Sequence, residues 1–287
     1  MENTNKGKYL LIPVSFDEKG ISAITYGCSL ARELNLGIKL LHVLTMAGIP
    51  APVEAHAGAT TYNYSAGDLM DQRKKQAEEK LRAMSNRVRK ESGLECSFTC
   101  KFGFVDIQVL KHSEKDHVVM VVMGTPQHDT VLDQLLGSRS LKIVNHSSTP
   151  VLLVPNLTGY LPIKTIVTGT SYENWDEKKI QWLADMAEVF KASLHFVRVV
   201  ESQDSEQKLT FEGYKKQVTE LLPDSIDHQF KIVKDISVDQ GIRDYALDNQ
   251  ADLIALQRSE KSGWERFFSH NVPKDMALAT NLPILVY

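Results

Sequence analysis

The sequence has no apolar run that approaches the roughly 20 residues needed to span a bilayer, and its 287 residues include only three cysteines. Charge of neither sign dominates, since 33 basic and 36 acidic side chains leave a formal net charge of -3. These absences argue against a membrane span, a disulfide framework, and general electrostatic attraction to nucleic acid or to an acidic membrane surface. The N-terminal residues also lack the apolar core of a signal peptide. We therefore expect a cytoplasmic protein with neither a nucleic-acid nor a membrane partner.

The positions of the cysteines argue against joint thiol chemistry. Cys96 and Cys100 fall in a predicted strand, where four residues separate two Cα atoms by about 13 Å. A disulfide requires less than roughly 7 Å. Cys28 falls in a predicted amphipathic helix and is expected to be a small buried thiol.

Motifs of common catalytic sites are missing as well. There is no Walker A sequence, no complete Gly-x-Gly-x-x-Gly, no His-Glu-x-x-His and no Cys-x-x-Cys. His42 and His56 could approach each other, but no further ligand pattern accompanies them. We expect no metal site, and no catalytic residue is predicted.

An internal repeat is the most informative feature that the sequence does contain. At a constant offset of 133 residues, the end of the first half matches the end of the second without a gap, pairing Gly124 with Gln257, Gly137 with His270 and Pro150 with Pro283. A second ungapped match at an offset of 156 joins the beginnings and pairs Ser15 with Ser171. Repetition of this length predicts two duplicated domains, residues 1–157 and 160–287, with a linker around Gly159.

Both halves alternate apolar strands with helical patterns, which predicts an α/β fold in which a parallel sheet is covered on both faces. The strands are expected near Tyr9–Val14, Ile38–Leu44, Cys96–Phe102, Val118–Met123, Val151–Val154, Thr165–Gly169, Leu194–Val199, Phe230–Val233, Leu253–Leu256 and Ile284–Val286. The helices are expected near Ile21–Leu34, Asp68–Lys90, Asp106–Glu114, from Ser138, and near Asp176–Phe190, Glu212–Leu222, Asp239–Asn249 and Pro273–Ala279.

One of these helices is strongly charged. The basic residues between Arg73 and Lys90 are interleaved with Glu78, Glu79 and Glu91. This pattern is typical of a solvated helix face and does not indicate an anion-binding patch.

The turn after the fourth strand is a candidate phosphate site. Gly124 closes the strand, Gly137 precedes the next helix, and Ser138 can cap that helix while offering a hydroxyl. Glycines let the backbone approach a ligand, and the N-terminus of the helix presents free N–H groups and a positive dipole end. Open α/β sheets bind ligands at this edge, although a glycine before a serine-capped helix is also ordinary structural punctuation.

With these residues in place, the chain resembles a tandem universal stress protein. The family's usual motif is Gly, two residues, Gly, nine residues, Gly and then Ser or Thr, and here Gly124, Gln127, Gly137 and Ser138 stand at those positions. The opening Ile12-Pro13-Val14-Ser15 and the strand end at Val43 extend the likeness. The resemblance implies two Rossmann-like domains of the HUP type, each an open five-stranded parallel sheet with helices on both faces. It also implies a site for ATP with Mg²⁺ in the first domain, formed by Pro13, Ser15, Val43, Gly124, Gln127, Gly137 and Ser138.

Departures from the family pattern weaken this expectation. Ser15 replaces the acidic residue that ends the first strand in ATP-binding members, and Asp17 could replace it only if the loop were reshaped. Gln127 replaces the middle glycine and narrows the space for a phosphate. In the second copy the four motif positions are occupied by Gln257, Glu260, His270 and Asn271. We therefore expect no ATP there, and interpret Arg258, Lys261, Arg266 and His270 as scattered surface charge.

Our leading hypothesis is a non-catalytic stress-response protein that binds a small ligand or a protein partner and retains a weakened nucleotide site in its first half. The alternatives are a slow ATP hydrolase at that site, or a carrier of apolar small molecules with the loop from Met46 to Gly67 as a lid. The resemblance implies that Val151–Val154 and Ile284–Val286 pair within one chain as a pseudo-dimer. Association of two chains into a homodimer is a further possibility.

Overall fold

The computed structural model describes residues 7–45, 66–115, 117–125, 138–156, 159–170, 175–200, 205–235, 238–258 and 282–287. The predicted helix Pro273–Ala279 and the loop from Met46 lie outside the described residues, apart from the loop's last two residues, Ala66 and Gly67, which begin a helix.

The first half alternates strands and helices as its sequence predicts. Its elements are β1 Tyr9–Pro13, α1 Glu18–Glu33, β2 Gly37–Leu44, α2 Ala66–Ser92, β3 Cys96–Phe102, α3 Val105–Ser113, β4 Val118–Thr125, α5 Ser138–His146 and β5 Val151–Pro155. The second half contains β6 Thr165–Gly169, α6 Glu177–Phe190, β7 Ser193–Val200, α7 Ser205–Leu221, β8 His228–Lys234, α8 Val238–Asp248, β9 Leu253–Leu256 and β10 Ile284–Val286. The predicted α/β class is confirmed.

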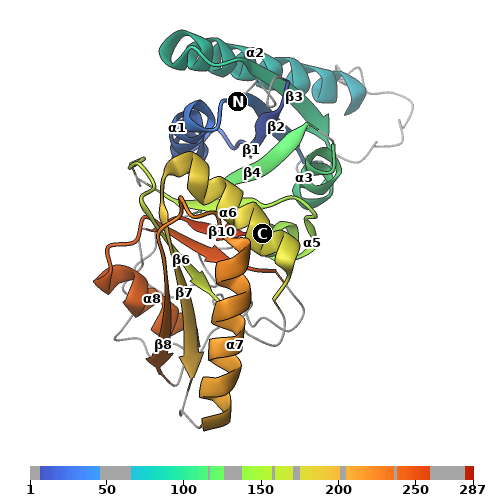
Figure 1. Ribbon diagram of the computed structural model, residues 1–287. Coiled ribbons are helices and arrows are strands. Elements are labelled where there is room, and N and C mark those ends of the chain that lie inside the picture. The colour runs from blue at the N-terminus through green and yellow to red at the C-terminus, as the bar shows by residue number, and fades with distance from the viewer. Residues whose placement is uncertain are drawn as a thin grey trace, which may run out of the picture.

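The ten strands that the structure describes form a single sheet in the order β3-β2-β1-β4-β5-β10-β9-β6-β7-β8. Pairing within each half is parallel, whereas β5 and β10 pair antiparallel, with Leu152 opposite Leu285. The predicted pairing of the two final strands within one chain is therefore confirmed. Because that pair is antiparallel, the carboxyl ends of the strands in the two halves lie at opposite edges of the sheet (Figure 1).

Two apolar layers enclose the sheet. On β1, Leu10 and Ile12 belong to the layer shared with α1, α2, α6 and α7, and Leu11 belongs to the layer shared with α3, α5 and α8. All three side chains are fully buried. A strand buried on both faces reads as a continuous apolar run, which explains why the sequence marks β1 so clearly.

The duplication is visible in local backbone geometry. Asn35 after α1 and Lys191 after α6 correspond at the offset of 156, and both adopt the left-handed conformation, with φ of 53° and 54°. The amide of the next residue donates to a carbonyl five residues back in both copies, from Leu36 to Ala31 and from Ala192 to Ala187. These are equivalent helix C-terminal caps.

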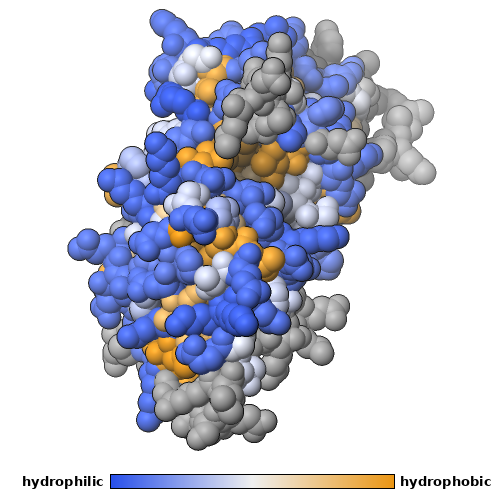
Figure 2. Space-filling model, in the orientation of Figure 1, coloured by the Kyte–Doolittle hydropathy of each residue, from blue (hydrophilic) through white to orange (hydrophobic). Residues whose placement is uncertain are grey.

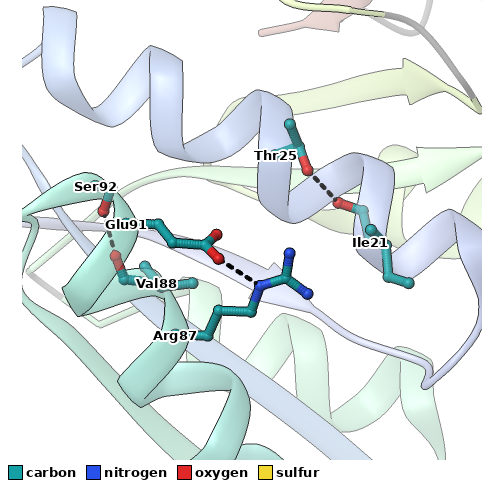
Figure 3. Close-up of polar contacts among 6 residues, drawn as sticks. All are labelled: Ile21, Thr25, Arg87, Val88, Glu91 and Ser92. Atoms are coloured by element: carbon teal, nitrogen blue, oxygen red, sulfur yellow. Dashed lines mark hydrogen bonds and ion pairs between the residues drawn. The ribbon is translucent and has the colours of Figure 1, made fainter.

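The charged helix is α2, and its polar face is solvated as predicted. Arg87 Nε donates to Glu91, as the dashed line in Figure 3 marks. The two atoms lie 2.8 Å apart, and the side chains are 75% and 61% exposed. In the same view Ser92 Oγ donates to the Val88 carbonyl at 2.6 Å. Exposed pairs of this kind contribute only about 0.3–0.5 kcal/mol each, so packing of the opposite face holds α2 on the sheet.

Hydrophilic residues cover most of the face in view in Figure 2, and hydrophobic residues gather there in a few separate groups. Among the helices that the structure describes, none has the length and apolar character required to cross a membrane.

The cysteines largely follow expectation. Cys96 and Cys100 lie in β3 and are buried, and all three cysteines are free. Cys28 is half-buried and packs against the core, so it is less buried than predicted. Burial raises the pKa of its thiol to about 11, which disfavours the reactive thiolate.

Candidate functional site

The candidate site lies where the strands of the first half have their carboxyl ends, which we call the carboxyl edge of this half. Because β1 lies between β2 and β4 in the sheet, Pro13, Val43 and Gly124 lie on three neighbouring strands at this edge. Ser138 is the first residue of α5. Gln127 and Gly137 lie outside the described residues. Of the seven predicted residues, the structure thus brings Pro13, Ser15, Val43 and Gly124 to one edge and places Ser138 at a helix start.

The loop after β1 uses its carboxylate to start a helix. Ser15 Oγ donates to Asp17 Oδ1 at 2.6 Å, and the same oxygen accepts from the Gly20 amide at 3.1 Å. Asp17 is therefore the N-cap of α1. A Cβ on Gly20 would lie 2.1 Å from the Ser15 carbonyl oxygen, so this close turn requires glycine. In this loop conformation Asp17 Oδ1 serves the start of α1, so whether Asp17 replaces the missing acidic residue stays a prediction.

Aromatic and basic side chains lie over the adjacent ends of β1 and β2. His42 Nδ1 lies 2.8 Å from the Val14 carbonyl oxygen, so this nitrogen carries the proton and donates. The rings of His42 and Phe16 lie 4.4 Å apart between centroids, and Lys80 Nζ of α2 lies 5.2 Å from the Phe16 ring. Sequence reasoning weighed His42 as a residue that could approach a pocket or His56, and it missed Phe16.

Neutral polar groups lie at the ends of β4 and β5. The Asn156 amide donates to the Thr125 carbonyl at 3.0 Å, which extends the β4–β5 ladder by one residue. Ser22 Oγ of α1 donates to Asn156 Oδ1 at 2.8 Å. These polar groups lie near the position between β1 and β4 at which the strand order reverses, where open α/β sheets bind ligands.

Metal ligands do not cluster in the described ranges, which hold no group of three or more His, Cys, Asp or Glu side chains placed to bind a metal ion. His56 lies outside those ranges, so its predicted approach to His42 stays a prediction.

The corresponding edge of the second half is occupied by the chain's own side chains. Arg258 directly follows Gln257, the counterpart of Gly124. Its guanidinium donates to the Ser147 carbonyl of the first half and, at 3.4 Å, to the Val286 carbonyl. The Lys179 ammonium of α6 donates to the Arg258 carbonyl. The interpretation of Arg258 as scattered surface charge is therefore wrong, because its guanidinium connects the two halves.

Burial shapes the electrostatics of this edge. Desolvation lowers the pKa of Arg258 and is also the main cause that lowers the pKa of Lys179, while Asp176 opposes the latter shift. Tyr287 stacks on Trp182 with 5.4 Å between ring centroids, and burial raises the pKa of its phenol to about 12. The side chains of Arg258, Lys179, Tyr287 and Trp182 thus occupy the end of the second half where a ligand would enter by analogy with the first.

Comparison with known proteins agrees with the fold and with the duplication. The model of the universal stress protein family matches residues 8–155 and 162–287. A universal stress protein from Archaeoglobus fulgidus DSM 4304 has a similar structure, with a TM-score of 0.71, 14% identity, and 97% of each chain covered. A putative universal stress protein from Pseudomonas aeruginosa UCBPP-PA14 gives a TM-score of 0.53 and 13% identity, covering 97% of this chain and 91% of that one. At these identities the likeness concerns the fold.

A universal stress protein solved in complex with cAMP is 14% identical and covers 44% of this chain and 98% of its own, with a TM-score of 0.34. No curated protein matches the sequence of the present chain.

Proposed function

Because the chain belongs to the universal stress protein family, we propose that it acts in the cytoplasm by binding and without catalysis, and that its first half holds the single nucleotide site. Family membership supports a role in the stress response. The ligand proposed for the site is ATP with Mg²⁺, in a binding mode weakened by Ser15 and Gln127.

The asymmetry between the two duplicated edges is the observation that carries this proposal. In the first half Gly124 is the penultimate residue of β4, and α5 begins at Ser138 beyond it. At the corresponding position of the second half, Arg258 and Lys179 donate to backbone carbonyls of the chain itself. A ligand in the second half would have to displace these bonds and leave partly buried carbonyls without a donor, which costs up to about 1–3 kcal/mol for each group.

The residues of the first half fit the phosphates of ATP better than its base. Gly124 and the N-terminus of α5 would face the phosphates, because backbone N–H groups and the helix dipole favour anions. Pro13, Ser15 and Val43 would lie beside the sugar or base. Mg²⁺ is commonly held by substrate phosphates with few protein carboxylates, so the proposal does not require a dedicated metal site.

Native mass spectrometry of the full chain, with and without ATP and Mg²⁺, tests the number of sites. We expect one nucleotide per chain, lost in Gly124→Val and retained in the control Gly159→Val, because a Cβ at Gly159 meets nothing within 4 Å. Two nucleotides per chain, or none, would contradict the proposal. The same spectra report whether two chains associate into a homodimer.

Two further assays separate the alternatives. Phosphate release above that of a heat-treated sample, abolished by Gly124→Val, would identify a slow hydrolase. A lipid or metabolite recovered consistently by solvent extraction would instead identify an apolar carrier. We expect neither result.

A further inference from the structure

The outward face of α3 begins with two large exposed apolar side chains. Phe104, the N-cap residue, is 69% exposed, and Ile107 in the first turn is 56% exposed. Lys111 and Glu114 are exposed at the following positions of the same helical stripe. Phe104 makes no side-chain capping bond, so a side-chain cap does not compete for the first-turn amides of α3.

A basic stripe lies on the neighbouring helix. Helix α5 packs against α3 on the same face of the sheet (Figure 1). Its exposed residues include Arg139, Lys142 and His146, spaced three and four apart on one side of the helix. Asp106 of α3, which is 16% exposed, pairs with Lys142 at 3.7 Å. We call Phe104, Ile107, Lys111, Arg139 and Lys142 together the α3–α5 surface.

The duplication shows that the fold does not require this surface. At the offset of 133, the second half carries Ser237 in place of Phe104, Gln240 in place of Ile107 and Asp244 in place of Lys111. The equivalent helix α8 packs on the sheet through Ile242 and Ala246 just as α3 packs through Val109. A helix at this position therefore packs on the sheet without apolar or basic residues on its outward face.

We propose that the α3–α5 surface binds an acidic amphipathic segment of a partner protein. Apolar anchors of the segment would cover Phe104 and Ile107, and its carboxylates would face Lys111, Arg139, Lys142 and the first turn of α3. A protein partner is favoured over nucleic acid. The apolar part of the surface consists of one aromatic ring, Phe104, and one aliphatic side chain, Ile107, whereas single-stranded nucleic acid is bound by stacking of bases on aromatic rings. The inference rests on the proposed function only in that the chain acts by binding, and the partner surface does not depend on ATP.

Fluorescence anisotropy with the full chain tests the surface directly. The probe is a fluorescein-labelled helical peptide with Leu at every third or fourth position and Glu between. A matched peptide carries Gln in place of each Glu, and a labelled single-stranded oligonucleotide represents nucleic acid. We expect the acidic peptide to bind with a dissociation constant on the order of 10–100 μM and to weaken as salt is raised.

The variants transplant residues of the second copy onto the first. Phe104→Ser and Ile107→Gln should each weaken binding about five- to tenfold, as loss of an interface anchor does, and Lys111→Asp should weaken it further at low salt. Val189→Gln, which removes a 55% exposed side chain from α6, is the matched control and should bind as the unchanged protein does.

Several results would overturn the inference. These are no binding of the acidic peptide, equal binding of the Gln peptide, stronger binding of the oligonucleotide, or equal losses in Val189→Gln and Ile107→Gln. Failure of ATP binding in the mass spectra would leave these anisotropy results unchanged, so the two proposals fail separately.

Discussion

Replacement of Arg258 by methionine should weaken the connection between the two halves. Methionine keeps an apolar stem of similar reach and removes the guanidinium that donates to the Ser147 and Val286 carbonyls. A hydrogen bond from a charged donor contributes about 1.5–3 kcal/mol, and the 3.4 Å contact with Val286 adds little. Since the guanidinium itself is partly desolvated, part of this gain is offset. We expect the free energy of unfolding to fall by about 2 kcal/mol, within the range of these two effects.

Urea unfolding followed by two signals measures this effect. All three tryptophans, Trp175, Trp182 and Trp264, lie in the second half, so their fluorescence reports on that half, while far-ultraviolet circular dichroism reports on the whole chain. A loss of 2 kcal/mol should lower the urea midpoint by about 1 M at an m-value of roughly 2 kcal/mol/M. The fluorescence transition should move ahead of the circular dichroism transition if the second half is released first.

The duplicate supplies the control. Thr125 occupies the position of Arg258 in the first half, and its hydroxyl makes only a 3.4 Å contact with the Val154 carbonyl. Thr125→Val should therefore change the unfolding free energy by less than about 1 kcal/mol. Equal midpoints for Arg258→Met and the unchanged protein would refute the assignment of Arg258 as a connection between the halves.

Two further predictions concern stability. Gly20→Ala should destabilise the protein by about 2–3 kcal/mol, because its Cβ would lie 2.1 Å from the Ser15 carbonyl oxygen. Gly213→Ala in α7 has open space and should stabilise by about 0.5–1 kcal/mol, so a similar melting shift in both variants would contradict the steric argument. Burial lowers the pKa of His195 below its usual value, so below the unfolded-state pKa the unfolded chain binds a proton first. As the pH is lowered from the unfolded-state pKa to the folded-state pKa, the free energy of unfolding should therefore decrease. His195→Gln should reduce this dependence of the melting temperature on pH, and it should do so more than His117→Gln at an exposed site. Equal slopes in these two variants would contradict it.

Much of the fold was predictable because the core strands are buried on both faces. The bounds of β6 and β9 match their predictions, since a continuous run of apolar residues ends where the chain leaves the sheet. The start of α7 was predicted seven residues late, at Glu212 in place of Ser205. The missing stretch is rich in Glu, Gln, Lys and Leu, which favour helix by propensity but lack an apolar period.

The candidate site was less predictable because its new contacts leave no pattern in the sequence. Arg258 donates to carbonyls 111 and 28 residues away. Because every residue carries a backbone carbonyl whatever its side chain, the residue type at the acceptor position gives no signal. The Asp17 cap is a contrary case, because an acidic residue just before a helical segment is a local signal. Sequence reasoning nevertheless weighed Asp17 as a ligand residue, since the cap depends on the turn at Gly20.

The antiparallel β5–β10 pair explains how a degenerate second copy remains part of the structure. It places the carboxyl end of β9, followed by Arg258, beside the amino end of β5. Ser147 lies there, immediately after the last residue of α5, and its amide donates to the Ile143 carbonyl. Helix α5 therefore has its N-terminus at the candidate phosphate site of the first half and its C-terminal end bonded to the second half. Because this bond needs only a cation on one side and a backbone carbonyl on the other, it does not require the glycine motif, and the second copy can retain it without binding a nucleotide.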